Sequence, residues 1–223
     1  MEMTTKNELE AKTKPSPKRN REKTRQRILD VALKEFAENG LSGGNTDEIA
    51  AKAEITKRLI FYYFSSKEEL FTAVLEQAYA KMRDEEHKLG LDALQPKAAL
   101  RALVNFTFDF DDSHQDFVRL VLTENIHRGR HMAHSLKLQE MTQPIIEQIT
   151  RLLARGVAVG VFRRGIDPIE LHMTLSALCF FHQGNSHTFG RQFDYDMSSP
   201  AAKVKRKKQI FELMWRYIRA ETS

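Results

Sequence analysis

The chain has 223 residues, a single cysteine and a formal net charge of +5. A chain of this length can bury a full hydrophobic core without disulfides or metals, and one cysteine excludes a disulfide framework within it. No apolar run approaches the roughly 20 residues that span a bilayer, and the first residues lack the apolar stretch of a signal peptide. We therefore expect a cytoplasmic protein without a membrane partner, built from a small head and a larger body.

Basic residues are concentrated near the start of the chain. Eight of them, and only one acid, lie between positions 12 and 27. Two prolines interrupt this polar segment, so we predict a disordered basic arm over residues 1–21. Such an arm can follow DNA phosphates or enter a minor groove. A second basic run, at 203–208, is interpreted as the solvated face at the start of a helix.

Two long helices are expected in the first ninety residues. From residue 22 to 39, apolar side chains repeat at spacings of three and four residues, and Gly40 follows as a C-terminal stop. Ser66 is placed to cap a second long helix, which is expected to end near Gly90.

Between these lie two short helices, over about 45–53 and 56–64. Asn45 is the expected N-cap of the first, and Glu48 is expected to return a hydrogen bond to the Asn45 amide in a capping box. Thr56 opens the second. Two short helices joined by a tight turn predict a helix-turn-helix, in which the second helix enters the major groove of DNA.

The rest of the chain has the periodicity of helices throughout. Pro144 is expected to bend or divide its helix, because it removes a backbone donor and crowds the preceding turn. Alternating strand patterns are absent, so the predicted fold is all-α with about nine helices. The helices expected beyond residue 90 cover about 96–111, 115–128, 131–160, 168–188 and 200–220.

The segment from Thr24 to Leu75 reads TRQRILDVALKEFAENG and, after a short loop, NTDEIAAKAEITKRLIFYYFSSKEELFTAVL. In the order and spacing of these residues it resembles the DNA-binding head of the TetR family of bacterial transcription regulators. The resemblance implies a helix-turn-helix domain over residues 22–82, with the motif at about 45–64. It also implies a helical effector-binding and dimerisation domain over residues 83–223.

The start of the second short helix carries two basic residues at the end that helix-turn-helix docking points toward base edges. Arg58 can read guanine through two hydrogen bonds, whereas Lys57 suits a phosphate. The resemblance implies phosphate contacts at the two tyrosines that follow, and Lys67 adds charge at a helix N-terminus. The complete predicted DNA-binding set is Asn45, Thr46, Thr56, Lys57, Arg58, Leu59, Tyr62, Tyr63 and Lys67.

Four residues depart from the usual pattern of the family. Glu54 stands in the turn in place of a small residue, and the pair Gly44-Asn45 replaces a Thr-Ser pair. Leu59 occupies a position that is usually small or polar, where it can contact a thymine methyl group or simply pack. These departures leave the operator sequence open.

Histidines gather in the middle of the chain. His127, His131 and His134 follow a four-then-three spacing, but Gly129 interrupts the helix and no cysteine or carboxylate completes a set, so we expect no metal and no cofactor. We interpret them as a basic polar corner between helices. The alternative is a site for an acidic effector, bound by Arg128 and walled by aromatic side chains. The residues predicted to bind an effector are Phe106, Phe110, Glu124, His127, Arg128 and Phe181.

The last two expected helices carry more apolar surface than one helical layer needs. Residues 169–181 are apolar almost all round, and the final helix has a broad apolar face. Surplus apolar surface indicates a partner. The resemblance implies that these two helices pair with the same helices of a second chain to form a homodimer.

These features predict a sequence-specific transcriptional regulator that binds double-stranded operator DNA. We expect a repressor that is released by a small-molecule effector of unknown identity. A ligand-independent DNA-binding protein is the alternative. An enzyme is not expected, because the sequence has no Gly-rich phosphate loop, no metal-ligand set and no nucleophile beside a plausible base. A histidine-dependent enzyme is the weakest alternative.

Overall fold

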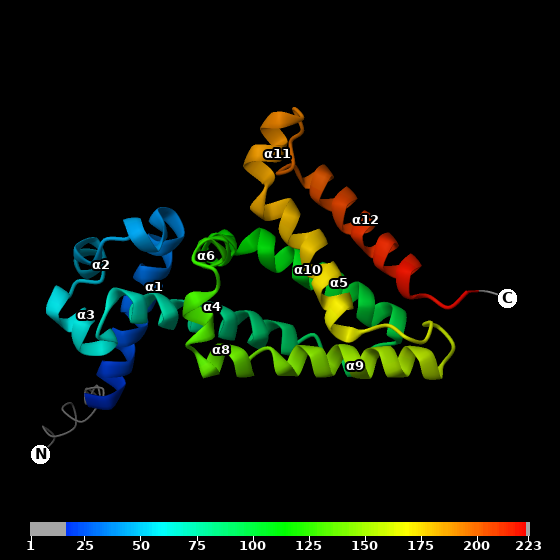
Figure 1. The fold of residues 1–223 in the computed structure, drawn as a ribbon, viewed down its shortest axis with the longest axis horizontal. Coiled ribbons are helices and arrows are strands. Elements are labelled where there is room, and N and C mark those ends of the chain that lie inside the picture. The colour runs from blue at the N-terminus through cyan, green and yellow to red at the C-terminus, as the bar shows by residue number, and fades with distance from the viewer. Residues whose placement is uncertain (1–16, 222–223) are drawn as a thin grey trace, which may run out of the picture.

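A computed structural model describes residues 17–221, which are almost entirely helical (Figure 1). The predicted all-α class is confirmed, although this part of the chain forms twelve α-helices instead of about nine. None of these helices is long and apolar enough to cross a membrane. A short 3-10 helix, η1 (Leu91–Ala93), follows the fourth, and the α-helices are α1 (Pro17–Gly43), α2 (Thr46–Lys52), α3 (Lys57–Phe64), α4 (Lys67–His87), α5 (Pro96–Ser113), α6 (Gln115–Ile126), α7 (Arg130–Ala133), α8 (Leu136–Glu140), α9 (Gln143–Ala158), α10 (Pro168–Gly184), α11 (Ser186–Gln192) and α12 (Pro200–Ile218).

The first helix is longer than predicted. It begins at Pro17, so residues 17–21 are helical and the prediction of a disordered arm is wrong for them. Proline suits the first helical turn, because the N–H it lacks has no partner within the helix there. The rest of the predicted arm, residues 1–16, lies outside the described residues. Gly40 has φ of 67°, which interrupts the helical run where the sequence predicted a stop.

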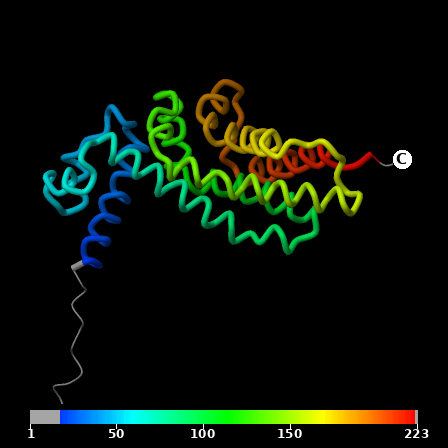
Figure 2. Tube along the Cα trace, turned by 60° about the horizontal axis from the view of Figure 1, so that its bottom comes forward, coloured from blue at the N-terminus to red at the C-terminus, as the bar shows by residue number. Residues whose placement is uncertain are grey.

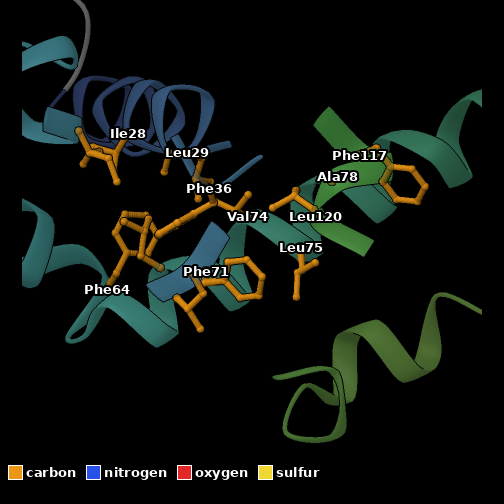
Figure 3. Close-up of a cluster of buried hydrophobic side chains, with 14 of the residues drawn as sticks. Ile28, Leu29, Phe36, Phe64, Phe71, Val74, Leu75, Ala78, Phe117 and Leu120 are labelled. Atoms are coloured by element: carbon orange, nitrogen blue, oxygen red, sulfur yellow. The ribbon is translucent and has the colours of Figure 1, made fainter. Parts of the chain in front are cut away.

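One hydrophobic core holds the head together and reaches into the body. Phe36 of α1 and Phe71 of α4 are fully buried, and their rings meet edge to face with centroids 5.3 Å apart. Figure 3 shows Phe117 and Leu120 of α6 in the same cluster. Because α6 packs against α1, and Phe117 of α6 meets Tyr79 of α4 edge to face at 5.1 Å, the head and the body share a core where they meet.

The loop between α1 and α2 passes closely over the Phe36 ring. A Cβ atom added to Gly44 would lie 2.6 Å from Cδ1 of that ring, which is closer than an ordinary carbon contact. Phe36 is fully buried and cannot easily move away. Close packing therefore explains the glycine in the Gly44-Asn45 pair.

The body has a second core among α5, α9, α10 and α12. Figure 1 shows α10 and α12 side by side with α11 at the end where they are joined. The turned view in Figure 2 places the head and the C-terminal residues at opposite ends of the molecule.

The second basic run, at 203–208, lies in α12. Lys203 and Lys207 of this helix form ion pairs at 2.8 Å with Asp112 and Asp109 of α5, respectively. Part of the second basic run is therefore paired with acids of the body instead of being only a solvated face.

The helix predicted over 131–160 is divided into three. Pro144 stands in the first turn of α9, so the expected division at this proline is confirmed. A further break occurs because the Ser135 hydroxyl accepts a hydrogen bond from the Leu138 amide and starts α8, while it donates to Glu76 of α4 at 2.8 Å. The predicted helix over 168–188 is likewise divided, into α10 and α11.

Candidate functional site

Asn45 caps α2 as expected. Its side-chain oxygen accepts a hydrogen bond from the Asp47 amide at 2.9 Å. The Asn45 amide, however, donates to the carboxylate of Glu35 in α1 at 3.1 Å, and Glu35 also accepts from Lys52 at 3.2 Å. The prediction that Glu48 completes a local capping box is wrong, because Glu35 of the preceding helix supplies the acceptor.

Glu35 carries its charge inside the head. Burial acts to raise the pKa of its carboxyl, but hydrogen bonds from Asn45, Lys52 and Asn39 outweigh burial and lower the pKa below its usual value. The carboxylate receives donors from both ends of α2 and from α1 itself. It therefore fixes the position of α2 relative to α1.

The third helix presents its polar side to solvent. Ile60 is buried in the head core, whereas Arg58 is exposed and the Tyr62 side chain is 63 % exposed. Lys57 is exposed too, and its Nζ lies 2.8 Å from the carboxylate of Asp47 in α2. Arg58 has no ion-pair partner within residues 17–221, so its guanidinium is available to an external acceptor.

The basic start of α1 lies against α3. The Arg21 guanidinium donates to the Tyr62 hydroxyl at 2.8 Å, and the Tyr63 hydroxyl donates to the Arg21 carbonyl oxygen at 3.3 Å. The Arg25 guanidinium lies over the Phe64 ring, 5.2 Å from its centroid. The helical start of α1 therefore adds positive charge beside the exposed side of α3.

The remaining predicted DNA-binding residues differ in exposure. Asn45 and Thr56 are exposed, and the Thr56 hydroxyl makes no capping hydrogen bond to α3. Leu59 is half-buried, as is Lys67, which donates to a backbone carbonyl oxygen near the end of α1 at 3.1 Å. Thr46 is 9 % exposed, so the structure places this side chain inside the head and away from the surface that the others share.

The turn between α2 and α3 is strained at Glu54. This residue has φ of 52°, a conformation that costs less for glycine than for a residue with a side chain. Its carboxylate lies 3.5 Å from the Arg27 guanidinium of α1. Lys57 and Arg27 are thus each paired with an acid of the same surface, and an approaching phosphate has to compete with those acids.

The six residues predicted to bind an effector do not form one site. Phe110 is buried in the core shared with the head, where its ring stacks on His114 with centroids 4.1 Å apart. Phe106 lies 5.7 Å from Phe110 at the edge of that core. Phe181 is 44 % exposed on α10 and packs against Phe189 of α11. Phe106 and Phe110 therefore pack together, whereas Phe181 packs in a different place.

Glu124 connects α6 to α7. Its carboxylate accepts hydrogen bonds from the backbone amides of His131 at 2.7 Å and Met132 at 3.0 Å, and it contacts Nδ1 of His131 at 2.7 Å. His127 touches only the edge of the His131 ring, and Arg128 is exposed in a turn with φ of 61°. Glu124 is therefore held in a closed internal contact instead of facing an effector, whereas Arg128 is exposed and its role in effector binding stays a prediction.

Buried ionisable side chains lie on α4, α5 and α10, and the sequence reasoning missed them. Arg83 and Glu86 of α4 form an ion pair, and Asp111 of α5 is 3 % exposed. Burial raises the pKa of Asp111 to about 7. Burial, with a smaller effect of the Arg83 charge, lowers the pKa of His172 in α10 to about 4.

Helical periodicity contained a signal for the two buried acids. Glu86 follows Met82 by four residues on the buried side of α4, and Asp111 follows Phe108 by three on the buried side of α5. An acid that continues an apolar stripe is placed inside the fold. Acids at these two positions therefore mark a buried polar site.

Two family profiles match the chain. One, described as bacterial regulatory proteins of the tetR family, matches residues 28–74, and the other, described as the C-terminal domain of tetracyclin repressor-like proteins, matches residues 96–214. The chain belongs to the TetR family. As a TetR-family protein it is a DNA-binding transcriptional regulator, and α2 and α3 are its helix-turn-helix.

Similar proteins agree with this membership. The TetR-family chain is 35 % identical over 198 residues to the HTH-type transcriptional repressor NicS of Pseudomonas putida, covering 89 % of this chain and 93 % of that protein. It is 32 % identical over 123 residues to the repressor SCO4008 of Streptomyces coelicolor, covering 55 % of this chain and 60 % of that protein.

Solved structures share the fold of this TetR-family chain. The fatty acid degradation regulator FadR from Bacillus halodurans has a TM-score of 0.66 at 19 % identity, covering 91 % of this chain and 96 % of that one. The ketosteroid regulator KstR2 of Mycobacterium tuberculosis has a TM-score of 0.63 at 18 % identity, covering 88 % and 95 %. At these sequence identities the similarity shows the shared fold alone.

Proposed function

We propose that the chain is a homodimeric, cytoplasmic repressor with a head over residues 22–82 and an effector-binding, dimerising body over 83–223. In this proposal a small molecule bound in the body releases the protein from its operator. The observation that carries it is the exposed side of α3, where Arg58 has no ion-pair partner within residues 17–221 and the basic start of α1 lies against Tyr62 and Tyr63. The similarity to NicS, named as a repressor, supports the sense of regulation.

The proposed DNA contacts follow from exposure and chemistry. Arg58 reads a guanine through two hydrogen bonds, because it stands in the first turn of the recognition helix with its guanidinium free. Lys57 and Tyr62 bind phosphates of the DNA. On binding, Lys57 gives up its ion pair with Asp47, and the Tyr62 hydroxyl gives up its hydrogen bond from Arg21. Asn45, Thr56, Leu59, Tyr63 and Lys67 complete the surface, and Thr46 contributes as a buried support.

Replacing Arg58 with alanine is expected to weaken binding to the operator by about 1–3 kcal/mol and to relax selectivity at one base pair. The measurement is the affinity for a DNA fragment from upstream of the protein's own gene, with single base substitutions and at several salt concentrations. Arg191→Ala, which removes an exposed arginine from α11, is the matched control and should change affinity little. Equal losses in both variants would contradict the role of Arg58.

The proposed dimer forms through α10 and α12. Their outward sides carry large apolar residues that are exposed in a single chain, among them Ile169, Met173, Leu213 and Tyr217 at 45–60 % exposure. Exposed apolar area on two adjacent helices fits an interface between copies. Two heads held by one interface can then occupy half-sites about one helical turn of DNA apart.

The variant Met173→Glu is expected to dissociate the dimer at micromolar concentration, because the interface would bury an unpaired carboxylate. Sedimentation equilibrium measures the change, and operator affinity should fall with it. Leu136→Glu is the control, since Leu136 is 75 % exposed on α8, away from these two helices. A Met173→Glu protein that remains dimeric would remove α10 from the interface.

The alternative of a ligand-independent DNA-binding protein makes a different prediction. Without an effector, no small molecule would weaken operator binding, whatever its concentration. The match of residues 96–214 to the C-terminal domain of tetracyclin repressor-like proteins favours the regulator that binds an effector. An enzyme is not proposed, because no described cluster combines a nucleophile with a base.

A further inference from the structure

Three aromatic side chains form a cluster at the surface where α10 passes into α11. The Phe181 and Phe189 rings meet edge to face with centroids 5.7 Å apart, and the centroids of Phe189 and Phe193 are 4.5 Å apart. Phe181 and Phe193 are 44 % and 58 % exposed in the single chain. A contiguous group of exposed rings, unlike a lone one, marks a site of contact with another molecule. These three residues are called the aromatic cluster below.

The segment that carries the aromatic cluster is held in place. Nε2 of His182 donates a hydrogen bond to the Met197 carbonyl oxygen at 2.9 Å, and both side chains are buried. The Tyr195 amide donates to the Gly190 carbonyl oxygen, also at 2.9 Å. These bonds tie the residues after α11 back to α10 and α11. The rings are therefore presented in a fixed arrangement, which lowers the entropy cost of binding a partner.

The opposite end of α10 borders a cavity that is open to solvent. Its volume is about 560 Å³, and Ile169 in the first turn of α10 lines it together with residues of α9, among them Ile146 and Thr150. Pockets of about 300–1,000 Å³ hold a drug-sized molecule, so this one has room for an aromatic side chain. It is called the α9–α10 cavity below.

A strip of exposed apolar residues joins the cavity to the aromatic cluster. Ile169, Met173, Ala177 and Phe181 recur every four residues along α10, and all four are exposed. Residues four apart are neighbours on the surface of a helix. The strip belongs to the side of α10 that the proposed dimer covers, so the α9–α10 cavity and the aromatic cluster are the two ends of one surface.

A two-fold axis brings these two ends together. Both heads of a dimer face one DNA duplex, so the axis points from the bodies toward the DNA, along the length of the molecule. Figure 1 shows the head at one end of that length and α10 running obliquely across it. A two-fold rotation about this axis reverses the direction of α10, so the two copies of the helix pair antiparallel. In such an isologous interface the aromatic cluster of each copy meets the cavity of the other.

The remaining exposed apolar residues of α10 and α12 supply too little area for a stable dimer. An obligate homodimer buries about 1,000 Å² or more on each chain, and about 65 % of that area is apolar. The residues outside the aromatic cluster are Ile169, Met173, Val204, Leu213 and Tyr217, at 45–64 % exposure. Each has roughly 100 Å² or less left to cover, since even an aromatic side chain buries only about 150–250 Å². A neighbouring surface therefore has to contribute.

We propose that the homodimer is completed by a reciprocal contact, in which the aromatic cluster of one copy packs into the α9–α10 cavity of the other. The occupant of the cavity is a second copy of this chain. This inference rests on the proposed dimer through α10 and α12, and it adds α9 and α11 to the interface. It also gives Phe181, predicted to bind an effector, a contact with the second chain.

Engineered cysteines test the contact directly. Phe193→Cys is combined in turn with Ile146→Cys, Glu147→Cys or Thr150→Cys, three positions that line the cavity. After mild oxidation, about half or more of the full chain is expected to run as a disulfide-linked dimer in at least one pair, because a disulfide forms only where the Cα atoms come within about 7 Å. The native Cys179 is fully buried and does not compete.

Two kinds of control accompany the cysteine pairs. Each single-cysteine variant should stay unlinked, which excludes a disulfide between two copies of the same position. Phe193→Cys/Leu136→Cys should stay unlinked too, since Leu136 is exposed on α8, away from α10 and α12. Links in this pair equal to those of the cavity pairs would come from random collision and would contradict the proposal.

Sedimentation equilibrium without DNA supplies the second measurement. Phe193→Ser is expected to raise the dimer Kd by about 10–100-fold, as for an aromatic anchor removed from a pocket, whereas Leu136→Ser should leave it unchanged. A dimeric chain in which no cavity pair links, or in which Phe193→Ser dimerises as tightly as the unmodified chain, would overturn the reciprocal contact and leave the proposed dimer standing. A monomeric unmodified chain would overturn both.

Discussion

Replacing Glu124 with leucine is expected to lower the free energy of unfolding by about 3–5 kcal/mol. The carboxylate accepts from the backbone amides of His131 and Met132 and contacts the His131 ring, and all of these groups lose their acceptor at once. Leucine fills a similar volume but accepts no hydrogen bond. The loss of unfolding free energy therefore measures the cost of leaving these buried donors without an acceptor.

Urea denaturation checks this prediction. Glu140→Leu is the matched control, because Glu140 is exposed on α8 and should cost less than about 0.5 kcal/mol. Glu124→Gln should fall between the two, since glutamine keeps one acceptor oxygen. A leucine variant of Glu124 that is as stable as the control, but that no longer responds to an effector, would restore Glu124 to the effector site.

Replacing Asp111 with asparagine is expected to stabilise the protein by about 4 kcal/mol at pH 8 and by less than about 1 kcal/mol at pH 4. The reason is that burial raises the pKa of Asp111 from 3.8 to about 7 in the folded chain. Between these two values the folded state holds a proton that the unfolded state has lost, so stability falls as pH rises, and above pH 7 it falls no further. Asparagine has no proton to lose and avoids this cost.

His172 acts in the opposite direction over part of this range. Its pKa is lowered from 6.5 to about 4, so the stability it contributes is complete above pH 6.5 and is lost as pH falls toward 4. In the unmodified chain the two effects offset each other between pH 4 and 6.5. In Asp111→Asn the stability should instead rise steeply with pH over that window. Glu86, whose pKa burial also raises, is present in both proteins.

Urea midpoints measured from pH 4 to pH 8 test both statements. Asp84→Asn, at an exposed position of α4, is the control and should show no pH-dependent gain. A gain for Asp111→Asn that is the same at pH 4 and pH 8 would show that folding does not raise the pKa of Asp111.

The elements that local chemistry determines could be predicted from the sequence. Gly40 interrupts α1, the Ser66 hydroxyl accepts from the Glu69 amide at the start of α4, and Pro144 stands in the first turn of α9, each as expected. These signals act within one helical turn, so a single sequence contains them. The Asn45 cap of α2 is a signal of the same kind, whereas Thr56 makes no capping hydrogen bond and the DNA-binding role of the two helices was inferred from the resemblance over Thr24 to Leu75.

Features that depend on distant helices could not be predicted. The partner of the Asn45 amide is Glu35, ten residues earlier, where local reasoning expected Glu48. Ser135 ends one helix and begins another because it is bonded to Glu76, 59 residues away. Glu124 similarly looked available to a ligand because its partners in α7 are seven and eight residues later, across a turn.

The single long run of α1 has a mechanical consequence. From Pro17 to Ala37 the helix spans about 30 Å, since each residue adds about 1.5 Å, and its far half packs on α6 of the body. A tilt of about 5° at the α6 contact therefore moves the basic end by about 2.6 Å. Tyr62 and Tyr63 of α3 are bonded to Arg21 near that end, so the recognition helix is carried along. We propose that the first helix works as a lever arm, by which a small repacking in the body would displace the recognition helix far enough to break hydrogen bonds to DNA.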